Sequence, residues 1–168
     1  IHASQLLGTD DFDVQFYGVA GQDESSARIF EIVRQTGLNV HNYQALSDKP
    51  TPFTNVLSDP DYDNGQGERT FINNIGAAWD YTPEQLPDYF FDSQIVCFGG
   101  TGLVPNIHDN LTALLTRAKS NHCLTVVNTV YNFRNEKKNP GQPWPLVKEP
   151  SDFQLIDVLI MDHDEALR

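Results

Sequence analysis

The residues best suited to chemistry form an acidic cluster near the end of the chain. After the apolar run 156–161, which is typical of a buried strand, come Asp162, His163, Asp164 and Glu165. Clustered carboxylates at such a position can hold Mg²⁺, which takes one or two carboxylates together with water and substrate phosphate. The same residues also suit the first turn of a helix, and both interpretations can hold together. His163 has no second ligand at helical spacing, so zinc is not expected.

A second polar segment follows another apolar run. Residues 128–134, Asn-Thr-Val-Tyr-Asn-Phe-Arg, come directly after the predicted strand 124–127. Amide side chains and an arginine suit a phosphate or polyol ligand, because a guanidinium presents forked donors to phosphate oxygens. A surface loop with a solvated Arg134 explains the same residue types equally well, so both interpretations stay open.

Two glycine-rich turns each join a predicted strand to a predicted helix. For residues 18–23 we favour a tight turn in which Asp23 caps the following helix. Residues 98–102, Phe-Gly-Gly-Thr-Gly, lack the full spacing and the acidic partner of a dinucleotide-binding fingerprint. Because glycine lets the backbone approach a ligand closely, we expect Gly99 and Gly100 to form a floor for a small polar ligand.

An alternation of acidic residues between 59 and 68 is similar to a calcium-binding loop. The pattern fails where Asn64 takes the place of the loop glycine and Thr70 takes the place of the bidentate glutamate. The flanking residues also have strand character, so a solvated hairpin turn is the favoured interpretation.

The elements that must position these segments alternate between strand and helix. Apolar patterning predicts strands at 12–19, 94–98, 124–127 and 156–161, and helices at 24–36 and from the Asn106 cap to residue 118. Alternation of this kind favours a parallel sheet covered on both faces, with ligands beyond the carboxyl ends of the strands.

Other segments depart from the alternation. Three short β-type runs, at 40–45, 52–57 and 69–73, favour a small antiparallel sheet. Thr82, Pro83 and Gln85 form the signature of a capped short helix. Residues 135–150, with four prolines, are predicted to be a polar loop.

The composition disfavours several classes of function. The 168 residues are 39% hydrophobic and 20% charged, which suits a single globular domain, and the net charge of −12 offers no basic face for nucleic acid. No apolar stretch approaches the ~18 residues that would span a membrane, and no secretory signal is evident. Cys97 and Cys123 lie in apolar runs, so we expect reduced core cysteines in a cytoplasmic protein.

The two ends of the sequence predict a longer polypeptide. The chain begins at Ile1 without an initiator methionine and closes on 164–168, which would form about one helical turn. A single turn without a packing partner is not stable. We therefore expect the sequence to be part of a larger protein.

Taken in order, these segments resemble the PfkB family of carbohydrate kinases, which is also called ribokinase-like. The resemblance covers nearly the whole chain and rests on the order of several short motifs. They are the glycine–aspartate turn 18–23, the paired strands at 51–54 and 67–71, the small residues Gly76 and Ala77, a D-x-N-x-R-like segment at 128–134 and an N-x-x-E-like motif at 162–165. Asn128, Asn132 and Asp162 depart from the family pattern or shift its register.

The resemblance implies an α/β fold of the ribokinase-like type. It implies a mostly parallel sheet flanked by helices, with a small antiparallel lid sheet whose strands lie within about 38–74. Residues 1–168 would then form an incomplete domain. The glycine-rich sugar-binding motif would precede residue 1, and the G-A-G-D segment with the catalytic base would lie beyond residue 168.

The implied reaction is phosphoryl transfer from ATP to a sugar hydroxyl, with Mg²⁺ as the metal. Under this resemblance Glu165 helps to hold the metal through water. Asn132, Arg134 and Asp162 contact nucleotide or phosphate. The sugar pocket is then lined by Gly99, Gly100 and Phe71. The resemblance also raises the expectation of a homodimer formed through the lid strands.

Two alternatives remain open at this stage. The departures at Asn128, Asn132 and Asp162 are compatible with a non-catalytic sugar- or nucleotide-binding protein on the same fold. A dinucleotide-dependent oxidoreductase depends only on the glycines around Gly99 and has the least support.

Overall fold

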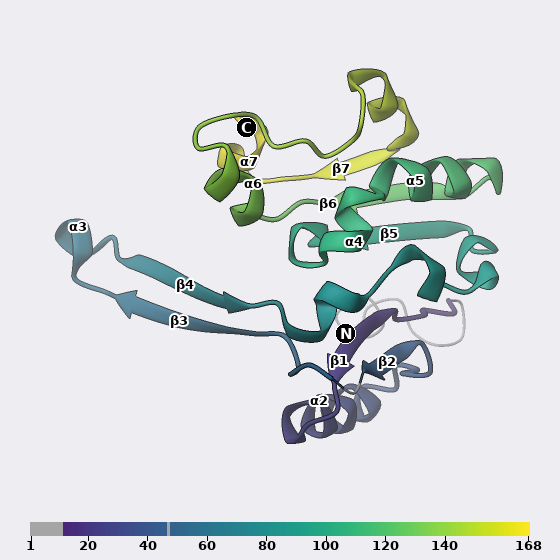
Figure 1. Ribbon diagram of the computed structural model, residues 1–168, viewed down its shortest axis with the longest axis horizontal. Coiled ribbons are helices and arrows are strands. Elements are labelled where there is room, and N and C mark those ends of the chain that lie inside the picture. The colour runs from purple at the N-terminus through teal and green to yellow at the C-terminus, as the bar shows by residue number, and fades with distance from the viewer. Residues whose placement is uncertain (1–11, 47) are drawn as a thin grey trace. The chain divides into compact units, whose positions relative to one another are not determined.

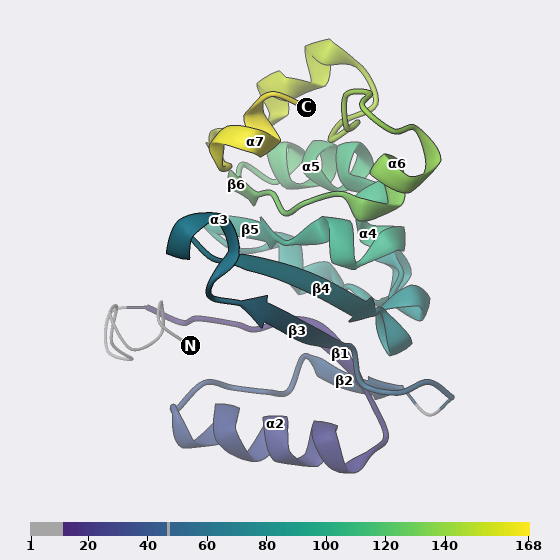
Figure 2. The same cartoon turned by 90° about the vertical axis from the view of Figure 1, so that its left-hand side faces the viewer.

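The computed structural model describes residues 12–46 and 48–168. It divides into two compact units, Ile1–Ala78 and Trp79–Arg168, which we describe separately (Figure 1; Figure 2 gives a second view). Sequence composition predicts one domain and gives no sign of this division. Residues 1–8 resemble the helix that follows the glycine-rich motif of the family, and this expectation lies outside the described residues.

The N-terminal unit begins with a strand–helix–strand repeat. Strand β1 (Gly18–Gly21) pairs in parallel with β2 (Tyr43–Leu46), and helix α2 (Glu24–Gln35) connects them. Strand β1 is shorter than predicted, because residues 12–17 contain only an isolated bridge from Gln15 to Asn39. Assigning 40–45 to the antiparallel sheet was wrong, since β2 pairs with β1 instead.

Asp23 explains why α2 starts where it does. Its Oδ1 accepts a hydrogen bond from the Ser26 amide at 2.9 Å, so the predicted cap is confirmed. The carboxylate also accepts bonds from the hydroxyl and the amide of Thr51, at 2.6 and 2.7 Å. These bonds lower the pKa of Asp23, and the bond from the Thr51 hydroxyl has the largest effect. One carboxylate thus joins the helix start to the segment that leads into the hairpin.

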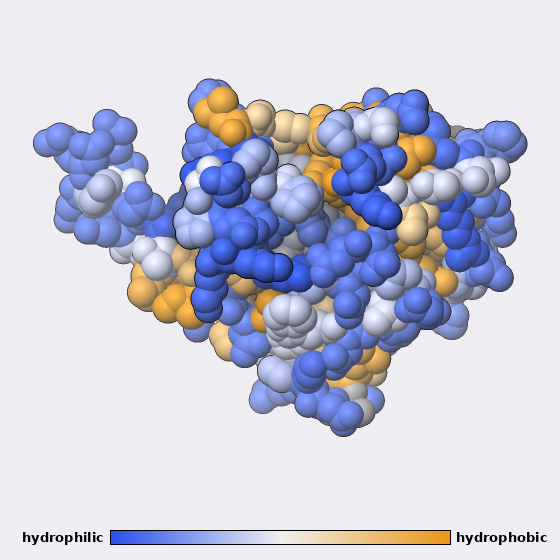
Figure 3. All heavy atoms as spheres, turned by 45° about the horizontal axis from the view of Figure 1, so that its top comes forward, coloured by the Kyte–Doolittle hydropathy of each residue, from blue (hydrophilic) through white to orange (hydrophobic). Residues whose placement is uncertain are grey.

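An antiparallel hairpin projects from this unit. Strand β3 (Phe53–Asp59) pairs with β4 (Glu68–Asn74), and the one-turn helix α3 (Tyr62–Gly65) closes the turn. The segment with the calcium-like pattern is thus a hairpin connection, as the strand character of its flanks predicted. Every residue of both strands is exposed. The tip is hydrophilic and hydrophobic residues gather along the strands (Figure 3).

The C-terminal unit is built on a three-stranded parallel sheet in the order β5-β6-β7. The strands are β5 (Ile95–Gly99), β6 (Leu124–Asn128) and β7 (Val158–Ile160). The α-helices are α4 (Pro105–Asp109), α5 (Leu111–Ser120), α6 (Phe133–Lys138) and α7 (His163–Ala166). The 3₁₀ helices are η1 (Gly76–Asp80), which crosses the boundary between the units, η2 (Pro83–Gln85), η3 (Asp88–Phe91), η4 (Thr101–Leu103) and η5 (Pro150–Leu155).

The core of this unit lies between α5 and the sheet. Leu111 and Leu115 on α5 and Val127 on β6 are almost completely buried. Burying such a side chain contributes about 1.5–3 kcal/mol each. The apolar residues of α5 thus face the core, as the patterning that predicted a helix here requires, and α5 fixes β6 and its polar carboxyl end.

The helix predicted from Asn106 to residue 118 is divided in two. Helix α4 ends at Asp109, and α5 starts after Asn110. The assignment of Asn106 as the cap was wrong, because Val104 occupies that position, with Pro105 at the first helical position. Asn106 instead donates its side-chain amide to the Trp79 carbonyl at 2.7 Å.

The sheet is less buried than the sequence predicts. Strand β5 alternates between exposed and buried residues, and Cys97 lies at an exposed position, so its assignment to the core was wrong. Cys123, just before β6, is buried as expected, and both are free thiols. Strand β7 has only three residues, and Val158 and Ile160 are exposed. The apolar runs therefore predicted the positions of these strands correctly but overestimated how many faces of the sheet are buried. Within residues 12–46 and 48–168, no helix has both the length and the apolar character needed to cross a membrane.

Candidate functional site

The predicted polar segments meet at the carboxyl edge of the three-stranded sheet. The sheet register pairs Gly99 with Asn128 and Asn128 with Ile160. Beyond the strands, the Gly100 amide donates to the Asn128 carbonyl and the Thr129 amide donates to the Ile160 carbonyl, both at 2.9 Å. The glycine turn, the 128–134 segment and the acidic cluster therefore lie side by side.

Glu165 is held in a fixed position at this edge. It forms a capping box with Asp162, whose Oδ1 accepts from the Glu165 amide at 2.7 Å. Glu165 Oε2 accepts from the Asp162 amide at 3.2 Å and from the Thr129 hydroxyl at 2.5 Å. Among the described residues, Oε1 accepts no hydrogen bond. One carboxylate oxygen is thus anchored, and the other remains able to bind a ligand.

The acidic cluster forms the start of α7, and this role is compatible with metal binding. Asp162, Asp164 and Glu165 line one hollow of about 440 Å³ together with Tyr131, Trp144, Leu167 and Arg168. No group of three or more His, Cys, Asp or Glu side chains in the described part of the chain is arranged as a metal cage. Mg²⁺ does not require such a cage, because it commonly takes one or two carboxylates and completes its shell with water and phosphate. The free oxygen of Glu165 fits that requirement.

Asn132 has an internal role. Its side chain is buried, with 5% exposed. Its Oδ1 accepts from the Asn135 amide at 3.0 Å and so caps α6. Its Nδ2 lies 3.0 Å from Nε2 of His108. Both ends of the amide are therefore engaged within the protein.

Arg134 is also partly engaged. Its two terminal nitrogens donate to the two carboxylate oxygens of Asp109 at 3.2 and 2.9 Å. The guanidinium carbon lies 5.4 Å from the centre of the Trp79 ring, within cation–π range. A guanidinium carries five N–H donors, so this bidentate pair leaves others available to a ligand.

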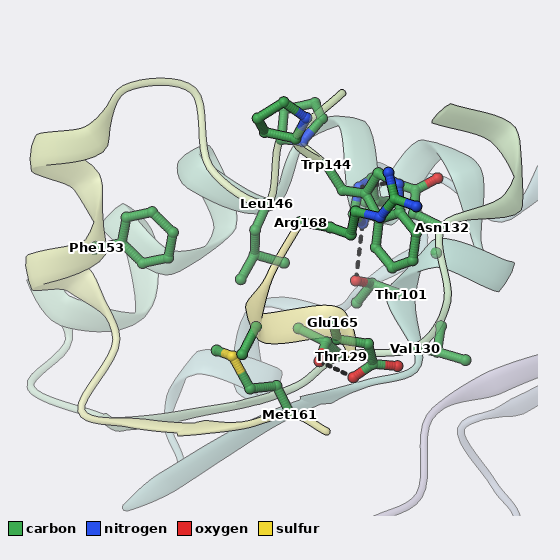
Figure 4. A pocket seen from close by; sticks show the side chains of 15 residues that line it. Thr101, Thr129, Val130, Asn132, Trp144, Leu146, Phe153, Met161, Glu165 and Arg168 are labelled. Atoms are coloured by element: carbon green, nitrogen blue, oxygen red, sulfur yellow. Dashed lines mark hydrogen bonds between the residues drawn. The ribbon is translucent and has the colours of Figure 1, made fainter. Parts of the chain in front are cut away.

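A cavity of about 270 Å³ lies next to Glu165. Figure 4 shows Phe153, Leu146 and Met161 on one side of the cavity, and Thr101 and Asn132 on the other. The full lining is Thr101, Gly102, His108, Thr129, Val130, Asn132, Pro143, Trp144, Pro145, Leu146, Phe153, Met161, Glu165, Ala166 and Arg168. A mainly apolar cleft with a few polar groups is typical of a small-molecule site.

Sequence reasoning missed Trp144, which covers part of this cavity. Its ring packs edge-on against Tyr131 with the ring centres 4.7 Å apart, and its Nε1 donates to Glu136 at 3.1 Å. Its amide donates to the Arg168 carbonyl at 2.7 Å. The proline-rich segment was predicted only as a polar loop. A tryptophan in a polar loop was the available sign that this loop packs against the rest of the protein.

The remaining predicted residues lie at open positions. A methyl group added at Gly99 or Gly100 would meet no atom within 4 Å, and Gly100 has a φ of 60°. Both positions therefore allow close approach to the backbone. Phe71 belongs to the other unit, where it lies exposed on β4.

The two units together define a ribokinase-like α/β fold. Solved structures support this class directly. Arabidopsis thaliana ribokinase complexed with ribose and ATP matches with a TM-score of 0.66 and 18% identity over 97% of this chain and 46% of that chain. Fructokinase with bound ATP from Xylella fastidiosa matches with a TM-score of 0.63 and 19% identity over 93% of this chain and 45% of that chain.

A third structure gives a similar result. A putative ribokinase II from E. coli in complex with ATP and Mg²⁺ has a TM-score of 0.65 and 15% identity over 90% of this chain and 46% of that chain. At these identities the likeness establishes the fold alone. The chain spans a little under half the length of the three structures.

A family model establishes the family. The model described as pfkB family carbohydrate kinase matches residues 1–168, so the chain belongs to the pfkB family. A search of curated proteins gave no match to the chain.

Proposed function

We propose that the protein containing this chain transfers a phosphoryl group from ATP to a hydroxyl of a sugar or related polyol. The observation that carries this proposal is the match of the carbohydrate kinase family model to the whole chain. The ATP complexes among the similar structures support the choice of donor. The catalytic base is proposed to lie beyond residue 168.

Glu165 is the proposed metal-binding residue. Thr129 and the capping box hold one carboxylate oxygen of Glu165, so the side chain is already ordered. The other oxygen can therefore bind a metal without a further loss of side-chain entropy. Mg²⁺ would supply charge neutralisation for the transferring phosphoryl group. Asp162 lies beside it, and its side chain contributes the cap that keeps Glu165 in place.

The substrate side is proposed to use Gly99 and Gly100 as the floor of the sugar pocket and Phe71 as a residue of the lid. Closure of the hairpin would exclude water and so limit hydrolysis of ATP. On the nucleotide side, Arg134 would offer phosphate the N–H groups that Asp109 does not use. Asn132 would act mainly by shaping the segment, since its amide is engaged.

We also propose a homodimer formed through the hairpin, and a cytoplasmic location. An isolated two-stranded hairpin is marginally stable in water. The exposed apolar residues on β3 and β4 therefore favour a partner surface. Free thiols at Cys97 and Cys123 suit a reducing compartment.

A second candidate is a non-catalytic sugar- or nucleotide-binding protein on the same fold. The observation in its favour is Asp162, because a second carboxylate beside Glu165 adds negative charge where phosphate would bind. A binder needs no base, and it would keep the pocket and the lid.

The test is consumption of ATP by the intact protein with a panel of sugars and nucleosides, coupled to detection of ADP. Glu165→Gln can keep the bond from Thr129 but loses the charge, so we expect turnover to fall about a hundredfold or more while thermal stability is retained. Glu31→Gln, on the exposed face of α2, is the matched control. Absence of turnover with every acceptor, together with stabilisation by a sugar or by ATP, would favour the binding protein.

A further inference from the structure

His108 connects the exits of two strands. The ring projects from α4, with Nδ1 3.0 Å from the hydroxyl of Thr101, which follows β5. Its Nε2 lies 3.0 Å from Nδ2 of Asn132, which follows β6. The ring also borders the cavity, and the Pro145 carbonyl of the proline-rich loop acts on it as a hydrogen-bond acceptor. One imidazole therefore touches the loops beside the proposed sugar floor and the proposed nucleotide segment.

The hydrogen bonds of Asn132 determine which nitrogen of His108 carries the proton. Asn132 Oδ1 accepts from the Asn135 amide, so the group that faces His108 is the NH₂ donor. His108 Nε2 must then accept, which requires it to be unprotonated. The single ring proton lies on Nδ1, where Thr101 Oγ1 can accept it. The bonds to Thr101 and Asn132 both form only in the neutral Nδ1–H form. The Pro145 carbonyl can accept only from a ring N–H, so it works against this form.

Protonation of His108 would break this arrangement. Both ring nitrogens would then donate, and Nε2–H would face the NH₂ of Asn132. Rotating the Asn132 amide would present Oδ1 to the ring, but α6 would lose its cap from the Asn135 amide. Since Asn132 is buried, a water molecule that replaced either bond would have to enter through the cavity that both side chains line.

The surroundings favour the neutral ring. Burial is the largest effect and lowers the pKa of His108; nearby Arg134 lowers it further, while Asp109 and the Pro145 carbonyl oppose the shift. The other charged groups that line the same cavity are Glu165 and Arg168.

We propose that His108 is a positioning residue whose neutral ring holds the β5 and β6 exits in one arrangement, so that acidification weakens ligand binding at both. The proposal rests on the proposed function, because it is that function which assigns a sugar to Gly99 and Gly100 and a nucleotide to residues 128–134. Only the neutral fraction of the protein would be competent to bind. Apparent KM should then rise by up to about tenfold for each pH unit below the pKa of His108.

The first experiment needs no ligand. Nitrogen-detected NMR of the intact protein should find His108 in the Nδ1–H form at pH 7.5, with His108→Gln identifying its signals. On acidification, the chemical shifts of the Thr101 and Asn132 amides should change with the same midpoint pH as the His108 ring signals. This change should be absent in His108→Gln. An Nε2–H tautomer, or loop signals that do not follow His108, would overturn the proposal whether or not the protein is a kinase.

The second experiment separates positioning from a general structural role. Glutamine can donate to Thr101 and accept from Asn132 without titrating, whereas leucine does neither. We expect His108→Gln to keep KM near the wild-type value at pH 7.5 and to make it independent of pH down to one unit below the midpoint that NMR finds for the wild-type ring. We expect His108→Leu to raise KM at every pH with a smaller change in kcat. His41→Gln, at an exposed position in the other unit, is the control and should retain the wild-type profile.

Failure of the kinase proposal would be recognised separately. If no acceptor is phosphorylated, the same variants are compared by the thermal stabilisation that ATP and each sugar of the panel produce. Loss of stabilisation at low pH in the wild type, with retention in His108→Gln, would still support the proposal. Equal pH profiles for the wild type, His108→Gln and His108→Leu would overturn it.

Discussion

At the scale of single residues, Asp157 shows how one carboxylate can join three elements. It precedes β7 and accepts two bonds from Lys119 on α5, at 2.9 and 2.8 Å. It also accepts from the amide and the hydroxyl of Thr125 on β6, at 2.7 and 2.9 Å. Thr125 is completely buried, so loss of its partner would leave the buried amide unsatisfied, whereas the hydroxyl can donate to the Leu155 carbonyl at 2.6 Å instead.

These bonds predict a stability change at acid pH. The bonds from Lys119, followed by those from Thr125, lower the pKa of Asp157 to about 2 from an ordinary 3.8. The unfolded chain therefore binds a proton before the folded chain does. The stabilisation is complete above about pH 3.8 and is lost as the pH falls towards 2.

Asp157→Asn should lower the urea midpoint at pH 7 and reduce the difference in stability between pH 5 and pH 2.5. Asp61→Asn, in the exposed hairpin turn, is the control. Asp23, Glu84 and Glu136 also have lowered pKa values, so the wild type keeps some acid sensitivity in every variant. A pH profile of Asp157→Asn that parallels the wild type would contradict the assignment.

Also at the scale of single residues, the sequence predicted a role for Glu165 but not for His108. Glu165 was predicted because carboxylates after an apolar strand form a local pattern. His108 was missed because its partners, Thr101 and Asn132, are 7 and 24 residues away. A sequence pattern reveals only residues at regular spacing along the chain. Hydrogen bonds that join three loops have no regular spacing, so no pattern predicts them.

At the scale of elements, the base of the hairpin is held by a close approach of backbone. The Ala77 amide donates to the Pro50 carbonyl at 2.9 Å, just outside the two strands. Gly76 has a φ of 49°, and a methyl group there would lie 2.1 Å from the same carbonyl oxygen. Only glycine fits this position without moving the segment that leads into β3.

Gly76→Ala should therefore destabilise the protein by about 1–3 kcal/mol through overpacking, beyond the backbone cost of a positive φ. Gly37→Ala is a matched control, since Gly37 also has a positive φ, of 78°, but a methyl group there would meet nothing within 4 Å. Urea unfolding of both variants gives the comparison. Equal losses of stability would show that the contact with Pro50 is unimportant.

The elements also show what the sequence could predict. Capping signals succeeded at Asp23 and at Thr82, because a cap depends on neighbours three residues away. The antiparallel hairpin was also predicted correctly. Strand partners were less predictable, and the segment that became β2 was assigned to the wrong sheet. Local chemistry fixes where an element begins, whereas its pairing depends on residues far away in the chain.

At the scale of the whole molecule, the hairpin exposes apolar side chains on both of its strands. Its register places Val56 opposite Phe71 on one face. Leu57 and Ile72 lie on the other face, because neighbouring residues of a strand point to opposite sides. All four are about half exposed. An antiparallel hairpin with apolar residues on both faces can serve two partners at once.

The two faces lead to a prediction that separates association from sugar binding. The Phe71 face is the one proposed to meet the sugar, so the face with Leu57 and Ile72 is the one expected to meet a second copy. The double variant Leu57→Lys and Ile72→Lys should shift the intact protein from dimer to monomer in sedimentation velocity, because two lysines on each copy would be desolvated at the interface.

Val56→Lys changes the opposite face and provides the control, so that variant should remain dimeric. Because lysine on an exposed strand disturbs folding little, thermal stability at low protein concentration should be similar in all three proteins. A wild type that stays monomeric up to the highest soluble concentration would exclude the dimer. A dimer that survives both lysines but dissociates in Val56→Lys would reverse the roles of the two faces, and would place the contact between copies on the side now assigned to the sugar.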